Sequence, residues 1–462
     1  MEMTGEERGR LSRGVKLGYG VCDLGGNLFF TVIGFLLMNF LTDTVGVLPA
    51  LAGTVVAIGK VWDAVTDPIT GFLSDRTKTR FGRRRPWMLL GSIPLFITMI
   101  ILFTNPGIQS QAYLFIWGVL VFCLVNTAYT AVNIPYNSLT PEMTRDYHER
   151  TSLNGYRFGF AAIGTIIGSV AALPVVGLFP DKNAGFTAMG TLFGFIMMVT
   201  ALITVAVVRE PAGEPELKTR GLFKTYLKIF KNRPFVLILL TYSLHLTALS
   251  VVMGIAIYYF KYVHHNEGAT TVAMGILIVV ALIFIPVSVI FSRRFGKKPA
   301  YSLGLAVFAA ALIVLSFTGH LFHVNYSYGL MVFAGMGLGF MYAIPWAMVP
   351  DAVEYDYLRT GERTEGAFYG VWTFGIKVGM ALSMAIIGGV LSLVGYVPNV
   401  AQTDLSLFGI RMLLGPIAGA IFIVGIVVLY FYPINEKRYG EILKEIAKME
   451  KTIILPNLPR GS

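Results

Sequence analysis

Long apolar stretches recur along nearly the whole chain, and they constrain the fold more than any other feature of the sequence. A bilayer core about 30 Å thick takes roughly 20 helical residues to cross, and on that measure we count about twelve membrane-spanning helices. The expected spans are residues 17–43, 48–74, 86–105, 112–138, 152–178, 185–208, 234–260, 269–292, 299–319, 326–350, 365–396 and 406–432.

The composition excludes a soluble chain of this size. Apolar side chains make up 55% of the 462 residues, charged side chains make up 14%, and the mean hydropathy is +0.67. Soluble domains average about 25% charged residues. So few charges could not cover a water-facing surface around so many apolar side chains. The sequence therefore predicts an all-α integral membrane protein.

The basic residues indicate how the chain is oriented. The formal net charge is +11, but Lys and Arg lie in short clusters between apolar spans, which argues against nucleic acid as a partner. When loops are assigned to alternate sides, 31 of the 37 basic residues fall on one side, and the loops of the other side hold only Lys182 and Lys261. Cytoplasmic loops carry such an excess. We therefore expect a multi-pass protein of the plasma (inner) membrane with both termini in the cytoplasm.

An internal repeat divides the chain into two halves. The motif RFGRRRP at residues 80–86 recurs as RFGKKP at residues 294–299, and IPY at 134–136 recurs as IPW at 344–346. These positions correspond in two six-helix halves, as in major facilitator transporters. The expected parts are halves at 1–209 and 234–434, a cytoplasmic linker with a short amphipathic helix at 210–233, and a cytoplasmic tail at 435–462 whose last four residues look like the remnant of an engineered protease site.

Two carboxylates in the second span predict a cation site. A charged side chain at the membrane centre costs roughly 2.5 to 3.5 kcal/mol, so each needs an explanation. Asp63 and Asp67 are four residues apart and lie on one helix face. Two like charges this close cannot both stay ionised in a low dielectric unless a positive group lies between them. Thr66 adds a hydroxyl and Pro68 leaves a backbone carbonyl without its usual donor, which gives a set of oxygen ligands that suits Na⁺ or Li⁺.

Two other interpretations of this pair stay open. One carboxylate could carry a proton, which would make H⁺ the coupling ion. Alternatively, the pair could form fixed salt bridges with Lys377 or Arg157 and serve packing only. Lys377 lies in the span at 365–396, one helical turn after Thr373, and it could hold the empty site together and yield to the ion.

Asp23 in the first span predicts a polyol-binding site. Small residues follow it in the sequence CDLGGN, and a carboxylate near Asn27 can accept two hydroxyl hydrogen bonds. The alternative is a hydrogen bond between two helices. Other polar or aromatic side chains that could line the substrate pocket are Tyr129, Thr130, Asn133, Tyr342, Trp346, Tyr369 and Trp372.

The basic loop between the second and third spans predicts a cytoplasmic gate. Its charges include Asp75, Arg76 and Arg83, and the expected partners after the span at 326–350 include Asp351 and Arg363. These charges would pair across the cytoplasmic face when the carrier opens outward. The alternative is that the loop only sets the orientation of the chain.

Signatures of soluble enzymes are missing from the sequence. It contains no Walker loop, no HExxH motif and no GxSxG motif. Cys22 and Cys123 each lie inside an apolar span, so a disulfide framework is not expected. We expect a transporter rather than an enzyme, acting as a monomer, with no cofactor apart from a coupling ion.

Five segments together carry a family resemblance. They are TDTVG at 42–46, KVWDAVTDP at 60–68, RFGRRRPW at 80–87, IP at 134–135 and GYVPNVAQ at 395–402. They resemble the glycoside-pentoside-hexuronide:cation symporters of the major facilitator superfamily and, more distantly, the sodium-dependent lysophosphatidylcholine symporter. The resemblance implies twelve helices and binding of Na⁺, Li⁺ or H⁺ by the helix 2 aspartates, with Thr66, Thr373 and Lys377 nearby. It also implies that Asp23, Arg157 and Tyr342 contact a sugar.

Two positions depart from the galactoside-carrying members of that family. Asn133 replaces an aspartate, and Asn137 replaces a stacking tryptophan. We therefore expect an intact cation site, a different sugar pocket, and symport of a sugar or glycoside with Na⁺ or H⁺. A Na⁺-dependent symporter of lysophospholipid is the first alternative, although Asp23 favours a sugar because the lysolipid symporter lacks this aspartate. A non-transporting membrane scaffold or sensor is the second alternative.

Overall fold

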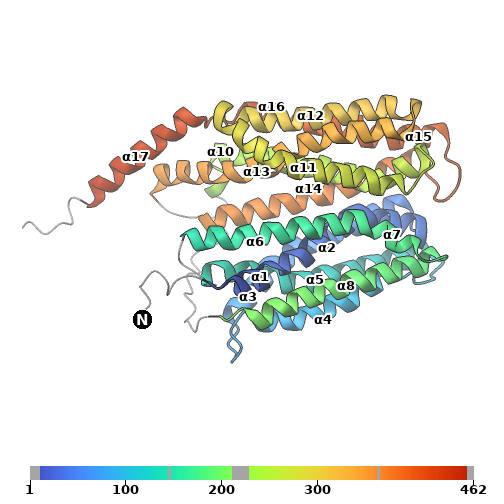
Figure 1. Cartoon of the computed structure of the whole chain (residues 1–462), viewed down its shortest axis with the longest axis horizontal. Coiled ribbons are helices and arrows are strands. Elements are labelled where there is room, and N and C mark those ends of the chain that lie inside the picture. The colour runs from blue at the N-terminus through green and yellow to red at the C-terminus, as the bar shows by residue number, and fades with distance from the viewer. Residues whose placement is uncertain (1–10, 144–146, 211–227, 362–364, 455–462) are drawn as a thin grey trace, which may run out of the picture. The chain divides into compact units, whose positions relative to one another are not determined.

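Helices are the main regular elements in the part of the chain that the structure describes. The structure is a computed structural model, and it describes residues 11–143, 147–210, 228–361 and 365–454 (Figure 1). The helices before the linker are α1 (Arg13–Gly20), α2 (Cys22–Asn39), α3 (Pro49–Arg76), α4 (Arg85–Leu102), α5 (Gln111–Met143), α6 (Tyr147–Ile166), α7 (Ala172–Gly177) and α8 (Lys182–Val207). Those after it are α10 (Arg233–Tyr258), α11 (Ala269–Phe295), α12 (Lys297–Thr318), α13 (Val324–Thr360), α14 (Glu365–Leu393), α15 (Asp404–Met412), α16 (Ala418–Tyr430) and α17 (Glu436–Ile454).

Short helical turns of other types continue several of these helices. The π-helical turns are η2 (Phe40–Val45), η3 (Ile167–Ala171), η4 (Tyr259–Val263) and η6 (Leu413–Ile417), and η5 (Gly319–Leu321) is a 3₁₀ turn. Turns of the π type occur often at functional sites. Both η2 and η4 extend a long helix, so the chain stays helical past the end of α2 and of α10.

The expected membrane spans agree with the helices. Among the described residues, eleven helical segments are long and apolar enough to cross a membrane. The remaining expected span is α3, which has 28 residues and carries Lys60, Asp63 and Asp67 in its middle. α13 continues to Thr360, beyond the expected end at residue 350, and includes both Pro345 and Pro350. A span estimate stops where the bilayer ends, whereas a helix can continue into water.

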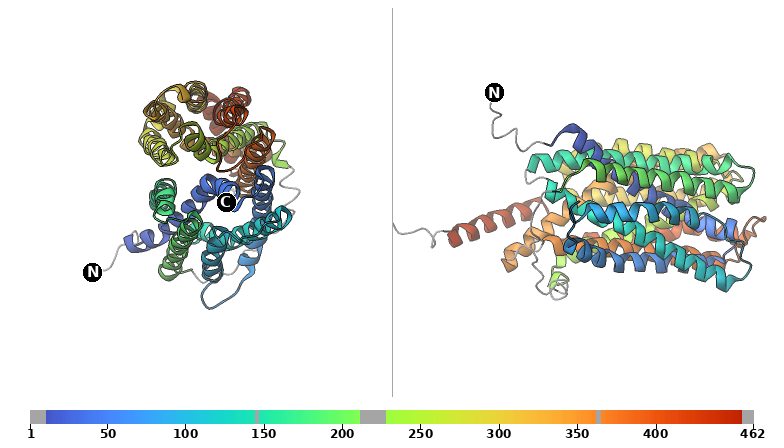
Figure 2. Two further views of the ribbon diagram at one scale, coloured as in Figure 1. Left: turned by 90° about the vertical axis from the view of Figure 1, so that its right-hand side faces the viewer. Right: turned by 90° about the horizontal axis from the view of Figure 1, so that it is seen from below.

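The described chain packs as two units. Unit 1 comprises Met1–Leu217, Ser250–Gly275 and Met380–Leu413, and unit 2 comprises Lys218–Leu249, Ile276–Gly379 and Leu414–Ser462. In unit 1, α4 packs against α5 and α8, and α2 packs against α6 and α8, so that the helices run side by side (Figure 2). In unit 2, α12 packs against α13 and α16. Unit 1 thus adds the last parts of α10 and α14 to residues of the expected N-terminal half.

Glycine contacts explain why part of α14 packs within unit 1. A Cβ on Gly53 of α3 would overlap the carbonyl oxygen of Met384, and it would lie 3.1 Å from Gly388 Cα. A Cβ on Gly388 would in turn overlap the carbonyl oxygen of Pro49. Only glycine lets two helix backbones approach this closely.

The glycine of the repeated basic motif has a positive φ in both copies. Gly82 has a φ of 99° and Gly296 has a φ of 92°. This region is strained for residues with a side chain and is open to glycine. The second copy lies between α11 and α12, as the first lies between α3 and α4. The local geometry therefore supports the repeat that the sequence predicts.

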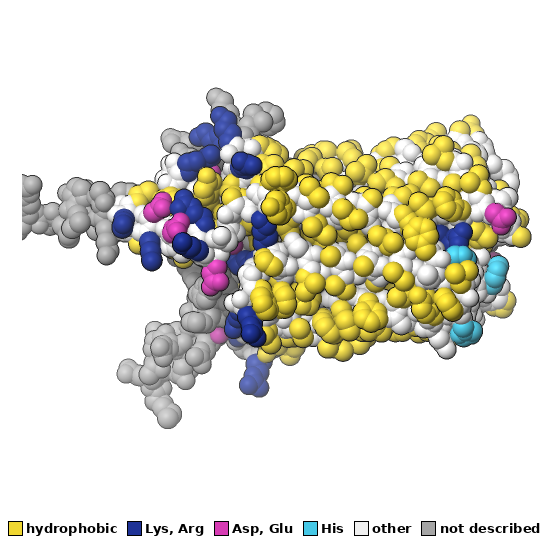
Figure 3. Space-filling view, turned by 90° about the horizontal axis from the view of Figure 1, so that it is seen from above, with side chains coloured by type: hydrophobic (Ala, Val, Ile, Leu, Met, Phe, Trp, Pro, Cys, Tyr) yellow, Lys and Arg dark blue, Asp and Glu magenta, His cyan; other side chains and the backbone are white. Residues whose placement is uncertain are grey.

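The surface and the ends of the chain agree with a membrane protein. On the face shown in Figure 3, hydrophobic side chains cover the helices, and Lys and Arg side chains gather toward one end. α17 forms part of the expected tail, and it packs against α13 within unit 2 (Figure 1). Most of the expected linker helix, and residues 459–462, lie outside the described residues.

We predict that Gly388→Ala lowers the melting temperature of the purified protein. The added methyl group has to displace the α3 backbone, and overpacking of this kind costs roughly 1 to 3 kcal/mol. The matched control is Gly389→Ala, because a Cβ on Gly389 would meet no atom within 4 Å. Its melting temperature should be unchanged or slightly higher. Equal melting temperatures for the two variants would contradict the close contact.

Candidate cation and substrate sites

The two aspartates of α3 lie on one face, as their spacing predicts. Asp63 is 1% exposed and Asp67 is partly buried. The Thr130 hydroxyl of α5 lies 3.0 Å from Asp63 Oδ1 and 3.1 Å from Asp67 Oδ1. A hydroxyl carries one proton and can donate to only one carboxylate at a time. The arrangement therefore places the Thr130 hydroxyl within hydrogen-bond distance of an oxygen of each aspartate.

Other oxygen atoms lie close to this pair. The hydroxyl of buried Thr66 donates to the backbone oxygen of Asp63 over 3.2 Å. Pro68 lies inside α3, where it has no amide hydrogen to donate. Carboxylate, hydroxyl and carbonyl oxygens are the ligands that hard cations prefer. The residues present thus have the donor set that could hold a cation such as Na⁺, and they include Thr130, which the sequence pattern assigns to the substrate pocket.

Lys60 lies one turn before Asp63 and is surrounded by aromatic rings. It is 4% exposed, and its Nζ lies between 5.3 and 5.9 Å from the ring centroids of Phe29, Phe30 and Phe122. The faces of aromatic rings attract cations. These rings help to stabilise a charged lysine at a position that is closed to water.

Asp23 of α2 and Arg157 of α6 form an ion pair. Arg157 Nε lies 2.5 Å from Asp23 Oδ2, and Nη2 lies 3.3 Å from Oδ1. The Tyr136 hydroxyl donates to the same Oδ2 over 2.7 Å, and Arg157 Nη1 donates to the Thr140 hydroxyl over 3.3 Å. Both charged side chains are mostly buried, with 15% of Asp23 and 19% of Arg157 exposed. Arg157 thus pairs with Asp23 of α2. The spacing of residues along the chain does not predict this pairing.

Arg157 also fixes the orientation of two amide side chains on α5. Arg157 Nη2 lies 2.6 Å from Asn137 Oδ1, and Asn137 Nδ2 lies 3.1 Å from Asn133 Oδ1. A guanidinium can only donate, so Asn137 must present its oxygen to Arg157 and its nitrogen to Asn133. Asn133 then accepts from Asn137 and keeps its own Nδ2 as a donor. Asn133 lines a small cavity together with Gly26 and Tyr129.

Two other expected substrate residues make contacts of their own in unit 1. Asn27 Nδ2 donates to the backbone oxygen of Asp23 over 3.0 Å. Tyr129 is 5% exposed and stacks on Phe29, with ring centroids 4.2 Å apart. The backbone of α2 therefore positions Asn27, and the ring of Phe29 positions Tyr129.

The remaining expected site residues lie in unit 2. Lys377 is 8% exposed, and the Thr373 hydroxyl donates to the backbone oxygen of Tyr369 over 3.0 Å. Tyr342 and Trp346 are exposed, at 52% and 46%. Trp372 is instead fully buried and stacks on Tyr242, with centroids 4.5 Å apart. The structure therefore places Trp372 in the core of unit 2, and its contact with a substrate stays a prediction.

The expected gate residues of α3 and the following loop make contacts inside unit 1. Asp75 pairs with Arg84, a buried arginine that the sequence analysis did not select. The Arg76 guanidinium lies 3.6 Å from the centroid of the Phe72 ring. The sequence predicts that these charges pair with charges of the other half when the carrier opens outward, and this pairing stays a prediction.

The basic motif around Arg83 also holds the end of α8. The Glu210 carboxylate accepts the backbone N–H groups of Arg83, Arg84 and Arg85, at distances between 2.7 and 3.0 Å. A Cβ on Gly82 would lie 2.5 Å from the Glu210 carboxyl carbon. Consecutive backbone amides at a helix start form an anion site, and here a side chain of the same unit fills it.

In unit 2, the expected gate residue Asp351 pairs with Lys297 of the second basic motif. The Lys297 ammonium lies 2.7 Å from both carboxylate oxygens of Asp351. Arg363 lies outside the described residues. Each copy of the repeat thus contains a basic residue that binds a nearby aspartate.

Comparison with known proteins decides the family. Residues 18–436 match the profile of the family described as MFS/sugar transport protein. The chain belongs to this family. The match covers both halves of the sequence, and it confirms the resemblance to the glycoside-pentoside-hexuronide symporters of the major facilitator superfamily.

Relatives of this family member are named as transporters. The chain is 31% identical to an uncharacterised symporter of Synechocystis sp., over 93% of this chain and 96% of the relative. It is 31% identical to a proposed sulfoquinovose importer of Escherichia coli, over 93% of each chain. It is 29% identical to an isoprimeverose transporter of Lactiplantibacillus pentosus, over 91% of this chain and 88% of the relative.

A solved structure shares the fold. The nucleoside transporter NupG matches with a TM-score of 0.63 and 13% identity, over 91% of this chain and 99% of that chain. At this identity the likeness shows the fold alone. The protein is a multi-pass membrane transporter of the MFS/sugar transport family with the major facilitator fold, and not an enzyme.

We predict that Asp23→Asn destabilises the protein more than the double variant Asp23→Asn/Arg157→Gln. Removing one member of a buried pair leaves the other charge unpaired, at a cost of roughly 3 to 5 kcal/mol that partial exposure reduces. Melting temperatures of the purified variants test this. Arg438→Gln, which breaks an exposed pair with Glu441, is the control and should change little. A double variant less stable than the single one would contradict the ion pair.

Proposed function

We propose that this transporter couples the movement of a cation, Na⁺ or H⁺, to the symport of a sugar or glycoside by alternating access. The observation that carries this proposal is the position of Thr130 between the buried carboxylate of Asp63 and the partly buried carboxylate of Asp67 on one helix. Relatives support the coarser part of the proposal, because two of them are named for transport of sulfoquinovose and of isoprimeverose, and others are named symporters.

The cation step uses Asp63 and Asp67. Two ionised carboxylates around one hydroxyl repel each other, and an entering cation removes that repulsion. The ion would take one oxygen from each aspartate and the oxygen of Thr130, with Thr66 beside them. Thr373 and Lys377 are the further contributors that the family resemblance proposes. A proton could take the place of the metal ion by neutralising one of the carboxylates.

The substrate step uses the ion pair of Asp23 and Arg157. Arg157 and Tyr136 occupy Asp23 Oδ2, and Oδ1 keeps a lone pair that can accept a sugar hydroxyl. Asn133 supplies a donor, because the amide chain from Arg157 uses its oxygen. A carboxylate oxygen and an amide donor that belong to one hydrogen-bonded chain through Arg157 and Asn137 suit hydroxyl groups of a sugar. Tyr342 and Trp346 would offer aromatic faces to the ring.

α5 connects the two sites physically. Thr130 contacts the aspartates of α3, and one to two turns later Asn133, Tyr136 and Asn137 lie beside Arg157. A cation that draws Thr130 toward α3 would also move the residues that line the sugar site. A movement of this kind makes the binding of each ligand favour the binding of the other, as symport requires.

The distribution of basic residues indicates how the protein is oriented in the membrane. We propose insertion in the plasma (inner) membrane with the basic loops and both termini in the cytoplasm. The protein would act as a monomer without a cofactor, with Asp75, Arg76, Arg83, Asp351 and Arg363 at the cytoplasmic gate.

We predict that Asp63→Asn or Asp67→Asn abolishes Na⁺-driven uptake in proteoliposomes and leaves binding of the substrate. Losing one charged ligand should weaken Na⁺ binding roughly 10- to 100-fold. The substrate is first found by a thermal-shift screen of glycosides, including isoprimeverose and sulfoquinovose, and of lysophosphatidylcholine, with and without Na⁺. Asp404→Asn, which alters an exposed carboxylate, is the control. Unchanged Na⁺ stimulation in both α3 variants would refute the cation site.

We predict that Asp23→Ala removes sugar binding and leaves Na⁺ binding largely intact. The variant loses the oxygen that accepts sugar hydroxyls, and the aspartates of α3 remain. The thermal shift caused by the sugar and the shift caused by Na⁺, measured separately, test this. A normal sugar shift in the variant would exclude Asp23 from the pocket. Shifts with lysophosphatidylcholine alone would favour the lysolipid alternative, and transport of neither class would favour a scaffold or sensor.

A further inference from the structure

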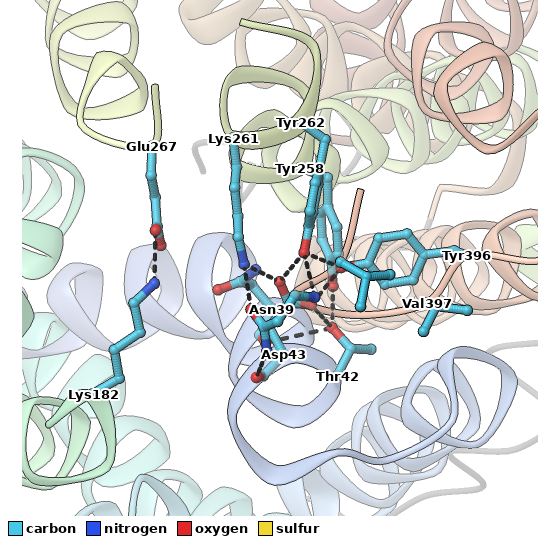
Figure 4. A network of polar contacts seen from close by, with 12 residues as sticks. Asn39, Thr42, Asp43, Lys182, Tyr258, Lys261, Tyr262, Glu267, Tyr396 and Val397 are labelled. Atoms are coloured by element: carbon cyan, nitrogen blue, oxygen red, sulfur yellow. Dashed lines mark hydrogen bonds and ion pairs between the residues drawn. The ribbon is translucent and has the colours of Figure 1, made fainter. Parts of the chain in front are cut away.

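A second buried carboxylate, that of Asp43, lies at the far end of α2 from Asp23. It belongs to the π-helical turn η2, and its side chain is 4% exposed. Figure 4 shows that it meets side chains from two distant segments, η4 at the end of α10 and the loop after α14. Neither the cation site nor the sugar site uses these residues, although both 42–46 and 395–402 stand out in the sequence.

Three donors from these two segments bind the Asp43 carboxylate. Lys261 Nζ lies 2.5 Å from Oδ2, and the Tyr262 hydroxyl donates to the same oxygen over 2.8 Å. The Tyr396 hydroxyl donates to Oδ1 over 2.6 Å. A buried carboxylate is stable only when it is paired and hydrogen-bonded in this way. Asp43 is therefore the hub of the network.

Asn399 completes the contact from the loop after α14. It has a φ of 60°, in the left-handed region that asparagine tolerates. Its Nδ2 donates to the backbone oxygen of Asp43 over 2.5 Å, and its Oδ1 accepts from Lys261 over 2.8 Å. Its backbone N–H donates to the Tyr262 hydroxyl over 3.0 Å. The loop is thus bound through backbone and side chain alike.

The network joins the two halves of the sequence. Asp43 comes from the first half, and Lys261, Tyr262, Tyr396 and Asn399 come from the second. Movement of one half away from the other at this end would have to break every one of these contacts. All of the groups are polar, so water can solvate them once they separate, which makes the closure reversible.

We propose that Asp43 is a latch that holds this end of the transporter shut during one stage of alternating access, and that its release from Lys261, Tyr262 and Tyr396 lets this end open. The inference rests on the proposed alternating-access function. It assigns a role in the transport cycle to Asp43 and Lys261 that differs from binding of cation or sugar.

A second ion pair at the same end supplies a matched control. Lys182 Nζ lies 2.7 Å from Glu267 Oε2, and this pair also joins the two halves (Figure 4). Its side chains are 54% and 30% exposed, whereas those of Lys261 and Asp43 are 14% and 4% exposed. Exposed pairs contribute little because water and salt screen them. Breaking this pair should not release the latch.

The test measures labelling of a buried reporter cysteine in the full chain in nanodiscs. Asn39 is 2% exposed, lies one turn before Asp43, and would be replaced by cysteine in a background with Cys123→Ser. Asn39→Cys should react slowly with a membrane-impermeant maleimide. Adding Asp43→Asn or Lys261→Met should raise the labelling rate about tenfold or more, because the equilibrium between closed and open states no longer favours the closed state as strongly. Adding Lys182→Met should not.

Native Cys22 separates opening from unfolding. It is 6% exposed and lies at the opposite end of α2 from the reporter. If the variants simply unfold, Cys22 reacts as well and the melting temperature drops, which would refute a latch. Val47→Cys, at a residue that is 1% exposed, provides a second reporter should Asn39→Cys fold poorly. The charge exchange Asp43→Lys/Lys261→Asp should restore slow labelling if the ion pair holds the end shut.

Unchanged labelling of both reporters in Asp43→Asn and Lys261→Met would overturn the latch. Labelling needs neither Na⁺ nor sugar, so this outcome would leave the symport proposal standing. Conversely, a transporter that shows no Na⁺-driven uptake but labels faster in these variants would lose the coupling proposal and keep the latch.

Discussion

Charged side chains in a low-dielectric surrounding need partners, and this requirement organises unit 1. Asp23 binds Arg157, Asp43 binds Lys261, and the two aspartates of α3 share the hydroxyl of Thr130. A carboxylate that lost these contacts would have to be protonated or hydrated. The three groups therefore fix how α2, α3, α5 and α6 are placed, and each is positioned to respond when a ligand or water supplies another partner.

The fold was largely predictable from the sequence, because each membrane-spanning helix needs its own apolar stretch. The aspartates of α3 were also predictable, since a spacing of four residues places both on one face. Partners from other helices were not. Arg157 could have bound the α3 aspartates, Thr130 could have faced the sugar pocket, and nothing in the linear pattern paired Arg84 with Asp75. Such choices depend on how the helices rotate and pack against each other.

The amide chain from Arg157 through Asn137 to Asn133 shows what tertiary contacts add. Either asparagine alone could donate or accept a hydrogen bond, so the sequence leaves their role open. The guanidinium removes this freedom, because it only donates. Asn137 consequently presents its oxygen to Arg157 and its nitrogen to Asn133.

The contact between Gly53 and Gly388 has a mechanical consequence. Helices that interlock through large side chains resist rotation, since every knob must leave its hole before the pair can turn. Where α3 and α14 meet, bare backbone faces bare backbone. The crossing angle between α3 and α14 can therefore change about this contact without the separation of interlocked side chains.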